Sequence, residues 1–219
     1  MNLDFTHKPQ IIELKNIDIP VKDVIRRMGY PDSEHESLSQ IKTLMDAELM
    51  RAKALFSPKG IYRSFRVAER TLNRLTFKNT KFTIHSEKVC RMLKDADPVI
   101  LFMVTIGPDL EKVVDELFAG GESTRGFILD AIGSETADAV ADKLHWEILS
   151  ELAKKNDYKV TPRFSPGYGD WSLTVQKEIL KVCAGDQLGI SVTPSSLMIP
   201  RKSVSAVLGL MRSKSNIKM

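Results

Sequence analysis

The sequence has few of the residues on which several common kinds of site depend. Its 219 residues include two cysteines, Cys90 and Cys183, without CxxC spacing, and four scattered histidines that form no HExxH motif. This pattern gives no sign of a zinc site and favours two reduced, buried thiols over a disulfide. Neither GxGxxG nor GxxxxGK[ST] occurs, so we expect no glycine-rich phosphate loop of the nucleotide-binding kind.

Other absences bear on partners and location. Aromatic residues make up 7% of the chain, the net charge is +4, and no dense block of lysine or arginine occurs. We therefore expect no nucleic-acid partner. No apolar run approaches the roughly 20 residues of a membrane span, and the N-terminus lacks the pattern of a secretory signal. We expect a cytoplasmic protein that has no association with a membrane.

The patterns that are present predict an α+β protein. The apolar run PVILFMVTIG, residues 98–107, predicts a central strand, and alternation over 61–67 and 82–86 predicts two more strands. Helical spacing covers residues 33–56, 107–122 and, as the longest pattern, 123–154. Because helices and strands do not alternate regularly, we predict an antiparallel or mixed twisted sheet flanked by long helices. We expect a single module over residues 1–219, with a possible helical lobe over residues 1–60.

The longest predicted helix carries a polar stripe beside its apolar one. Glu135, Asp138, Asp142 and His145 recur at steps of three, four and three residues, so they share one helix face. Two interpretations remain open for this stripe. It is either a solvated polar face with stabilising charge pairs, or a row in which one or more acids meet a cationic ligand in a groove.

The stretch TPRFSPGYGDW, residues 161–171, combines stiffness with close backbone approach. Its two prolines fix φ at their own positions and favour extended conformations before them. Gly167 and Gly169 permit dihedral angles that are closed to other residues. Arg163 is the one cation of the stretch, and its guanidinium matches a carboxylate or phosphate in a two-pronged geometry. The alternative is a structural loop in which Arg163 caps a helix end.

This stretch resembles the R-x-x-x-G-Y signature of the activation domain of cobalamin-dependent methionine synthase, a module that binds S-adenosylmethionine (AdoMet). Two further segments are similar to that family in the same order. They are TADAVADKLH, residues 136–145, and SLMIPRKSVSAV, residues 196–207. Together the three matches cover about residues 98 to 210, which leaves the N-terminal third unmatched.

The resemblance implies a binding role for residues of the stretch and of the long helix. Arg163 falls on the arginine that binds the methionyl carboxylate of AdoMet, and Pro166, Gly167 and Tyr168 complete the signature. Tyr168 would lie near the methyl group and the corrin, where it would help to position both. Asp138 falls on the acid that contacts the amino group of the ligand, although aspartate is shorter than the usual glutamate.

Two further positions follow from the same resemblance. Asp157 lies six residues before Arg163, where the family has a second acid, but the residues between them do not match. After the Ser-Val-Ser of the late segment the family usually has glycine and aromatic residues, whereas this chain has alanine, valine and Leu208. Because the family's contact there is largely through the backbone, Leu208 is expected to contact the ligand.

The resemblance also implies a mechanism and partners. Cobalamin that has oxidised to the cob(II) form is returned to methylcobalamin by AdoMet and an electron from a flavodoxin-like or ferredoxin-like reductant. The sequence has no D-x-H-x-x-G motif, which supplies the cobalt ligand in such enzymes. We therefore expect a free-standing module whose cobalamin is carried by a cobalamin-binding methionine synthase subunit or by another corrinoid protein. Such a module is a component of a methyltransferase, acting in its reactivation.

Three alternatives stay open at this point. The chain could reactivate a different corrinoid methyltransferase, which the sequence does not separate from methionine synthase. It could transfer a methyl group from AdoMet directly to a small molecule, although the glycine-rich loop usual for such enzymes is missing. It could also be a non-enzymatic module that binds nucleic acid, which the spread of its cations disfavours.

Overall fold

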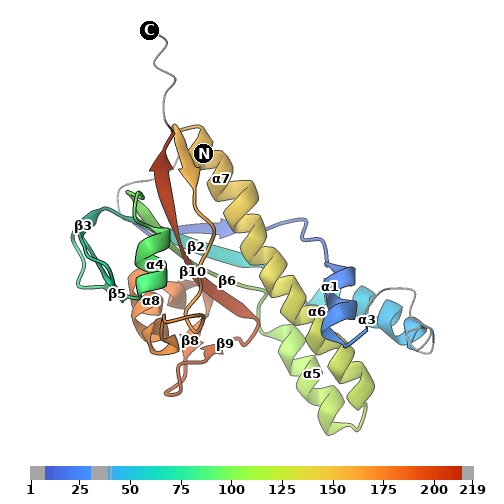
Figure 1. Cartoon of the computed structure of the whole chain (residues 1–219). Helices are drawn as coiled ribbons and strands as arrows, with labels where there is room; N and C mark the ends of the chain where they lie inside the picture. Colours follow the sequence, from blue (N-terminus) through green and yellow to red (C-terminus); the bar gives the residue numbers. More distant parts are fainter. Residues whose placement is uncertain (1–7, 31–38, 40, 214–219) are drawn as a thin grey trace.

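The backbone of the fold is a five-stranded sheet. In a computed structural model, which describes residues 8–30, 39 and 41–213, every neighbouring pair of these strands is antiparallel. In spatial order the strands are β1 (Gln10–Glu13), β2 (Lys59–Phe65), β6 (Val99–Thr105), β10 (Ser203–Arg212) and β7 (Tyr158–Val160). Helices cover this sheet on both sides (Figure 1). The α+β prediction is confirmed.

Strand β6 lies at the centre of the sheet and contributes to the core on both of its faces. All seven of its residues are buried, as the apolar run predicts. Successive side chains of a strand point to opposite faces, and here they enter two different hydrophobic clusters. Ile100, Phe102 and Val104 belong to one cluster, and Val99, Leu101 and Met103 belong to the other.

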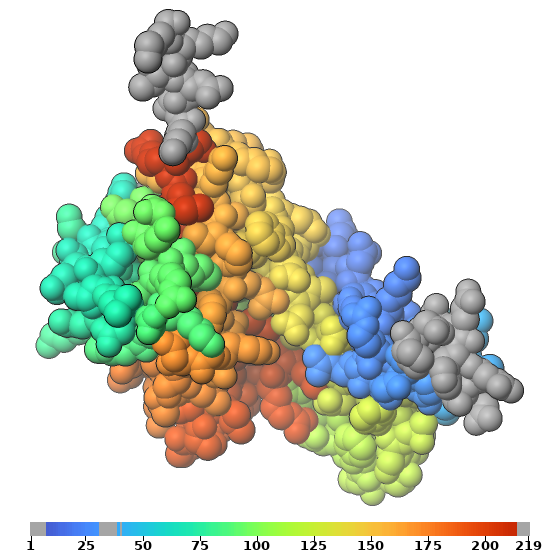
Figure 2. Space-filling view, in the orientation of Figure 1, coloured from blue at the N-terminus to red at the C-terminus, as the bar shows by residue number. Residues whose placement is uncertain are grey.

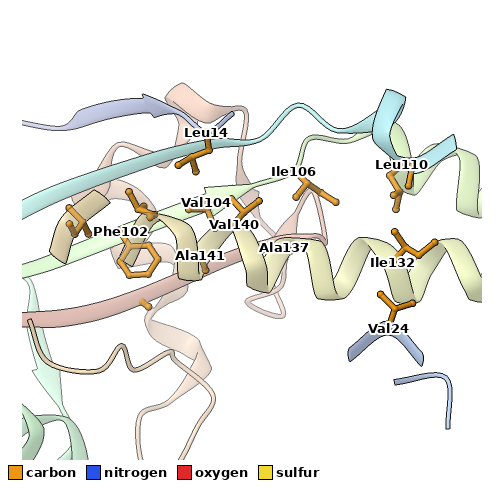
Figure 3. Close-up of a cluster of buried hydrophobic side chains, with 14 of the residues drawn as sticks. Leu14, Val24, Phe102, Val104, Ile106, Leu110, Ile132, Ala137, Val140 and Ala141 are labelled. Carbon is orange, nitrogen blue, oxygen red and sulfur yellow. The ribbon is translucent and has the colours of Figure 1, made fainter. Parts of the chain in front are cut away.

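One face of the sheet is covered by the long helix. It consists of α6 (Ser123–Asp142), a π-helical segment (Lys143–Leu149) and α7 (Ser150–Lys154), which together confirm the helix predicted over residues 123–154. Small side chains let this helix lie close to the sheet, because Ala137, Val140 and Ala141 are buried in the same cluster as Phe102 and Val104 (Figure 3).

Three further helices pack against α6. Together with the first part of α6 they form a helical group beside the sheet (Figure 1). They are α1 (Val21–Arg27), α3 (Lys42–Leu55) and α5 (Asp109–Ala119). Val24 of α1 and Met45 of α3 are buried in the cluster that also contains sheet residues. The N-terminal helices therefore share a hydrophobic core with the sheet.

The helix predicted over residues 33–56 is confirmed over Lys42–Leu55, which form α3. Helix α3 begins at Lys42, after Ile41. Residues 31–38 and 40 lie outside the described residues, as does the polar tail 214–219, so the predictions for those segments stay predictions. The sequence also gave no sign of β1, whose four residues pair with β2 at the edge of the sheet.

The opposite face of the sheet carries smaller elements. They are a three-stranded sheet of β3 (Val67–Arg70), β4 (Arg74–Phe77) and β5 (Thr83–His85), helices α4 (Glu87–Met92) and α8 (Gln176–Cys183), and the pair β8 (Ser191–Val192) and β9 (Met198–Ile199). The strand predicted over residues 61–67 is thus divided between β2 and β3. Cys90 and Cys183 are free and buried on this side, as predicted.

Candidate functional site

A cleft of about 610 Å³ opens where the long helix, the 161–171 turn and the start of β10 meet. This volume lies within the range of small-molecule sites. In Figure 2 the yellow, orange and red surfaces of these three segments adjoin one another. The lining residues are Asp138, Arg163, Phe164, Ser165, Pro166, Tyr168, Gln176, Met198, Ser203, Val204 and Ser205.

Arg163 forms ion pairs with two aspartates of the long helix at the cleft. Its Nε donates to Asp142 Oδ1 at 2.9 Å, and its Nη2 donates to Asp138 Oδ1 at 3.2 Å. Because the two aspartates are four residues apart on one helix, their carboxylates reach the same guanidinium. The Arg163 side chain is 22% exposed, while those of Asp138 and Asp142 are 48% and 53% exposed. Arg163 therefore forms ion pairs with side chains and does not cap a helix end.

The turn that carries Arg163 is anchored to β10 and to the core. Phe164 and Val207 exchange two backbone hydrogen bonds of 2.9 Å, and Gly167 N donates to Trp171 O at 2.8 Å. Gly167 has φ +91° and Gly169 has φ +59°, the left-handed region that favours glycine. Trp171 is buried in the second hydrophobic cluster. These contacts give the turn a fixed shape before any ligand binds.

Asp170 fastens the far end of the turn to α4. Its carboxylate accepts hydrogen bonds from Ser86 Oγ at 2.5 Å and from Glu87 N at 2.6 Å. These bonds stabilise the ionised carboxylate and therefore lower the pKa of Asp170. The hydrogen bond from the Ser86 hydroxyl has the largest effect, and those from the backbone N–H groups add to it. Ser86 is also the N-cap of α4, since its side chain accepts from Val89 N.

Each of the four residues of the polar stripe on the long helix has a partner from another segment. Glu135 forms an ion pair with Arg27 of α1, and the two aspartates pair with Arg163. His145 is fully buried, and its Nε2 lies 2.8 Å from Thr161 O. Burial lowers the pKa of His145, and the nearby Arg163 guanidinium lowers it further, against the opposing effect of the Thr161 hydrogen bond. The stripe therefore has the charge pairs of the first interpretation, and its Asp138 also lines the cleft that the second interpretation requires.

The structure brings together most of the residues that the sequence suggested. Asp138, Arg163, Pro166 and Tyr168 line one cleft. Pro166 is buried in its wall, whereas Tyr168 is 71% exposed at its rim. Gly167 contributes the bend between them and is absent from the residues that line the cleft. What any of these residues binds remains a prediction at this stage.

Leu208 requires a correction, because it does not reach the cleft. Its side chain is fully buried in the core, and it lies opposite Ile100 in the β6–β10 ladder. Val207 and Gly209 direct their backbone groups toward the turn and Thr161. Since backbone groups alternate along a strand, those of Leu208 point to β6. The cleft is instead lined by β10 residues three to five positions earlier.

Asp157 also lies away from the cleft. It occupies the turn between α7 and β7, with φ +61°, and its backbone oxygen accepts from Ser213 N at 2.8 Å. It is not among the residues that line the cleft. Asp142, which the family comparison did not single out, is the second acid that faces Arg163.

Sequence analysis missed a polar pair inside the cleft. Ser205 Oγ donates to Gln176 Oε1 at 2.8 Å, and both residues are buried. Gln176 begins α8, and Ser205 lies near the start of β10. A buried glutamine needs a hydrogen-bond partner, but its burial could not be inferred from a residue type that is usually exposed.

Residues 89–216 match the family model described as vitamin B12 dependent methionine synthase, activation domain. The chain belongs to this family. The match covers more than half of the 219 residues and contains the whole cleft, so the suspected resemblance is confirmed. The family thereby connects this cleft with a domain that serves a cobalamin-dependent enzyme.

A solved structure extends the likeness toward the N-terminus. The crystal structure of the MetH reactivation domain bound to AdoHcy matches with a TM-score of 0.70 and 17% sequence identity. The match covers 92% of this chain and 78% of that chain. At this identity it establishes a shared fold. Its coverage includes much of the N-terminal part that the family model does not match.

The described residues contain no candidate membrane span and no candidate metal site. No helix among them is long and apolar enough to cross a membrane. No group of three or more histidine, cysteine, aspartate or glutamate side chains within these residues could hold a metal ion.

Proposed function

We propose that the chain binds AdoMet in the cleft and supports the reductive methylation of cob(II)alamin on a separate cobalamin-dependent methionine synthase. The observation that carries this proposal is the pairing of Arg163 with Asp138 and Asp142 in the cleft wall. It places a cation and two anions where the activation-domain signature lies. We propose Asp138, Arg163, Pro166, Gly167 and Tyr168 as the ligand-binding residues.

The charges of the cleft complement those of AdoMet. The ligand has a carboxylate, an ammonium group and a sulfonium. In the cleft, Arg163 would take the carboxylate through its planar guanidinium, while Asp138 would turn from Arg163 to the ammonium group. Asp142 would stay on Arg163 Nε, where it lies at 2.9 Å. The amino-acid end of AdoMet thus replaces one internal ion pair with two, so that both its carboxylate and its ammonium group have a partner.

Tyr168 and the prolyl wall would serve the reaction by position. Bound AdoMet would supply the methyl group to the reduced cobalamin of the partner in an in-line displacement, with AdoHcy as the leaving group. Such a reaction depends chiefly on the alignment of the two reactants. Tyr168 is 71% exposed at the rim, so its ring and hydroxyl face the side from which a partner would approach. Pro166 would fix the wall against which the ligand lies.

The proposed partners are a cobalamin-carrying protein and a reductant. We place the cobalamin on a methionine synthase subunit, with another corrinoid methyltransferase as the outcome that a partner screen would decide. A flavodoxin-like or ferredoxin-like protein would supply the electron. The chain itself would contribute the AdoMet site and the open rim around it, as one component of the methyltransferase.

Titration calorimetry with AdoMet, AdoHcy and ATP tests the binding step. Micromolar binding of AdoMet and AdoHcy without binding of ATP supports the proposal. If AdoMet binds neither to the chain alone nor to the chain together with a cobalamin-loaded partner, the proposal is overturned.

A reactivation assay then tests the chemistry. The cob(II)alamin-loaded partner is mixed with the chain, AdoMet and a reduced flavodoxin, and the cob(II) absorbance is followed. Loss of that absorbance should require all the components. Methyl transfer to a small molecule without any corrinoid would instead favour a direct methyltransferase.

A further inference from the structure

His145 occupies an unusual position for a histidine outside the ligand cleft. It lies in the π-helical segment that follows α6, is fully buried, and is not among the residues that line the cleft. Its Nε2 lies 2.8 Å from the carbonyl oxygen of Thr161. A carbonyl oxygen can only accept, so Nε2 carries the proton. Nδ1 has no hydrogen-bond partner among the described residues. The bond from Nε2 to Thr161 is therefore the one hydrogen bond that the ring forms with these residues.

The bond acts on the entry to the ligand-binding turn. Thr161 N donates to Gly209 O, and Gly209 N donates to Thr161 Oγ1, both at 2.9 Å. Thr161 is therefore fixed to β10 on one side and, through His145, to the long helix on the other. Because a peptide unit is planar, holding its carbonyl oxygen holds the whole plane between Thr161 and Pro162.

Few free torsions separate that plane from the arginine of the site. Pro162 has its φ fixed by its ring, so only its ψ and the torsions of Arg163 itself remain. Arg163 in turn meets Asp138 and Asp142 on the same helix. The long helix thus contacts the turn through two ion pairs of Arg163, whose acids are about half exposed. It also contacts the turn through the buried, neutral hydrogen bond between His145 and Thr161.

We propose that His145 is a positioning residue, which holds Arg163 in place when Asp138 leaves it to meet the ligand. This inference rests on the proposed AdoMet site. The ligand would exchange the Asp138 pair, and the acids of both pairs are about half exposed, whereas the His145–Thr161 bond is buried away from the cleft and persists. A neutral imidazole suits this task, because a second cation beside Arg163 would repel it. The lowered pKa of His145 agrees with a neutral ring.

The test compares two substitutions and two ligands. His145→Leu removes the donor, while His145→Gln places an amide N–H near the position of Nε2. The ligands are AdoMet, which has the methionyl carboxylate, and 5′-methylthioadenosine, which lacks it. We expect His145→Leu to weaken AdoMet binding about tenfold, the scale of one lost hydrogen bond, with 5′-methylthioadenosine unchanged. His145→Gln should restore most of the AdoMet affinity.

A merely structural histidine gives a different pattern. Equal losses for both ligands, or a His145→Gln variant as weak as His145→Leu, would overturn the positioning role. Thermal unfolding of each variant establishes that the titrations are made on folded protein. If His145→Leu does not fold, His145→Asn replaces it, because its amide nitrogen sits near Nδ1 and falls short of Thr161.

A measurement without ligand separates this inference from the proposed function. Should the wild-type chain bind neither ligand, the AdoMet proposal fails, and the NMR signal of the Arg163 Nε–H still tests His145. In the wild type and in His145→Gln this proton should exchange slowly, because Asp142 holds it. In the variant without the donor it should exchange fast. Unchanged exchange in that variant refutes the positioning role whatever the ligand.

Discussion

Among the cations that form ion pairs with the long helix, Lys202 and Arg163 occupy sites that differ in access. Near its first half, Lys202 Nζ contacts Ser134 Oγ at 2.7 Å and Asp130 Oδ1 at 2.6 Å, and the Lys202 side chain is 10% exposed. Eight residues beyond Asp130, Asp138 contacts Arg163 on the wall of the cleft. Both sites join β10 or its neighbouring turn to the same helix.

The comparison separates a structural ion pair from one that a ligand can exchange. We call the Lys202 site closed, because Lys202, Ser134 and Asp130 are not among the residues that line the cleft, although the Asp130 side chain is 42% exposed. The backbone N–H of Lys202 also donates to the buried Glu111 at 2.5 Å. The Arg163 site has similar charges, but it lines the cleft of about 610 Å³ in which we propose that AdoMet binds. Charge alone therefore does not identify the functional site; an adjoining cavity does.

The largest expected effect is on ligand affinity at the open site. Arg163→Ala should weaken AdoMet binding by about 2 to 4 kcal/mol, the scale for removing one partner of a charge-assisted pair. The free energy of unfolding should change by less than about 1 kcal/mol, because half-exposed ion pairs contribute little to stability. Calorimetry and urea unfolding measure the two quantities.

Arg163→Lys is the matched control for that experiment. It keeps the charge but loses the planar fork, so its affinity should fall between those of the wild type and Arg163→Ala. An alanine variant with wild-type affinity would contradict the assignment of the carboxylate to Arg163. A large loss of stability in the same variant would erase the distinction between the two sites.

The reverse result is expected at the closed site. Lys202→Met keeps the aliphatic stem but removes the ammonium group, so Asp130 and Ser134 lose their partner. The free energy of unfolding should fall by about 2 kcal/mol, while AdoMet affinity should change by less than about threefold, within the scatter of a surface substitution. Urea unfolding at neutral pH measures the loss. If affinity falls more than stability, the Lys202 site is also part of the ligand site.

A smaller effect is expected at the rim of the open site. Tyr168→Phe removes an exposed hydroxyl, so stability should stay within about 0.5 kcal/mol and AdoMet affinity within about threefold. The rate of cob(II)alamin reactivation should fall about tenfold, the cost of one positioning contact in the reacting complex. A stopped-flow absorbance assay compares the two rates. Loss of affinity with an unchanged rate would place Tyr168 on the ligand only.

The sequence predicted those parts of the fold that depend on local patterns. The strand β6 and the 123–154 helix both follow from the spacing of apolar residues. β4 escaped prediction because it is only four residues long, and its alternation is too brief to distinguish from a loop. The arrangement of helices on one face and small strands on the other depends on packing between distant segments.

The candidate site was predictable where a residue type and a motif agreed, as for Arg163 and Asp138. It was not predictable where the direction of a backbone decided the outcome. Leu208 occupies the position of the motif at which the family contacts the ligand. In this structure, however, its backbone points to β6 and its side chain to the core. His145 and Gln176 were missed as partners because burial and pairing across the fold determine their roles.

The smallest expected effect concerns the far anchor of the turn, and it sharpens the comparison by adding a second closed contact. The hydroxyl of Ser86 and the N–H groups of α4 hold the pKa of Asp170 below its ordinary value. A lowered folded-state pKa stabilises the fold above the unfolded value of about 4 and ceases to do so as the pH falls through the folded value. Asp170→Asn should therefore lower the Tm slightly at pH 7, and the difference from the wild type should shrink between pH 4 and pH 2. Scanning calorimetry of both proteins over this range measures it. A difference that stays constant with pH would mean that Asp170 acts through shape alone, while a fall in AdoMet affinity at pH 7 would show that the closed anchor, too, sets the position of Arg163.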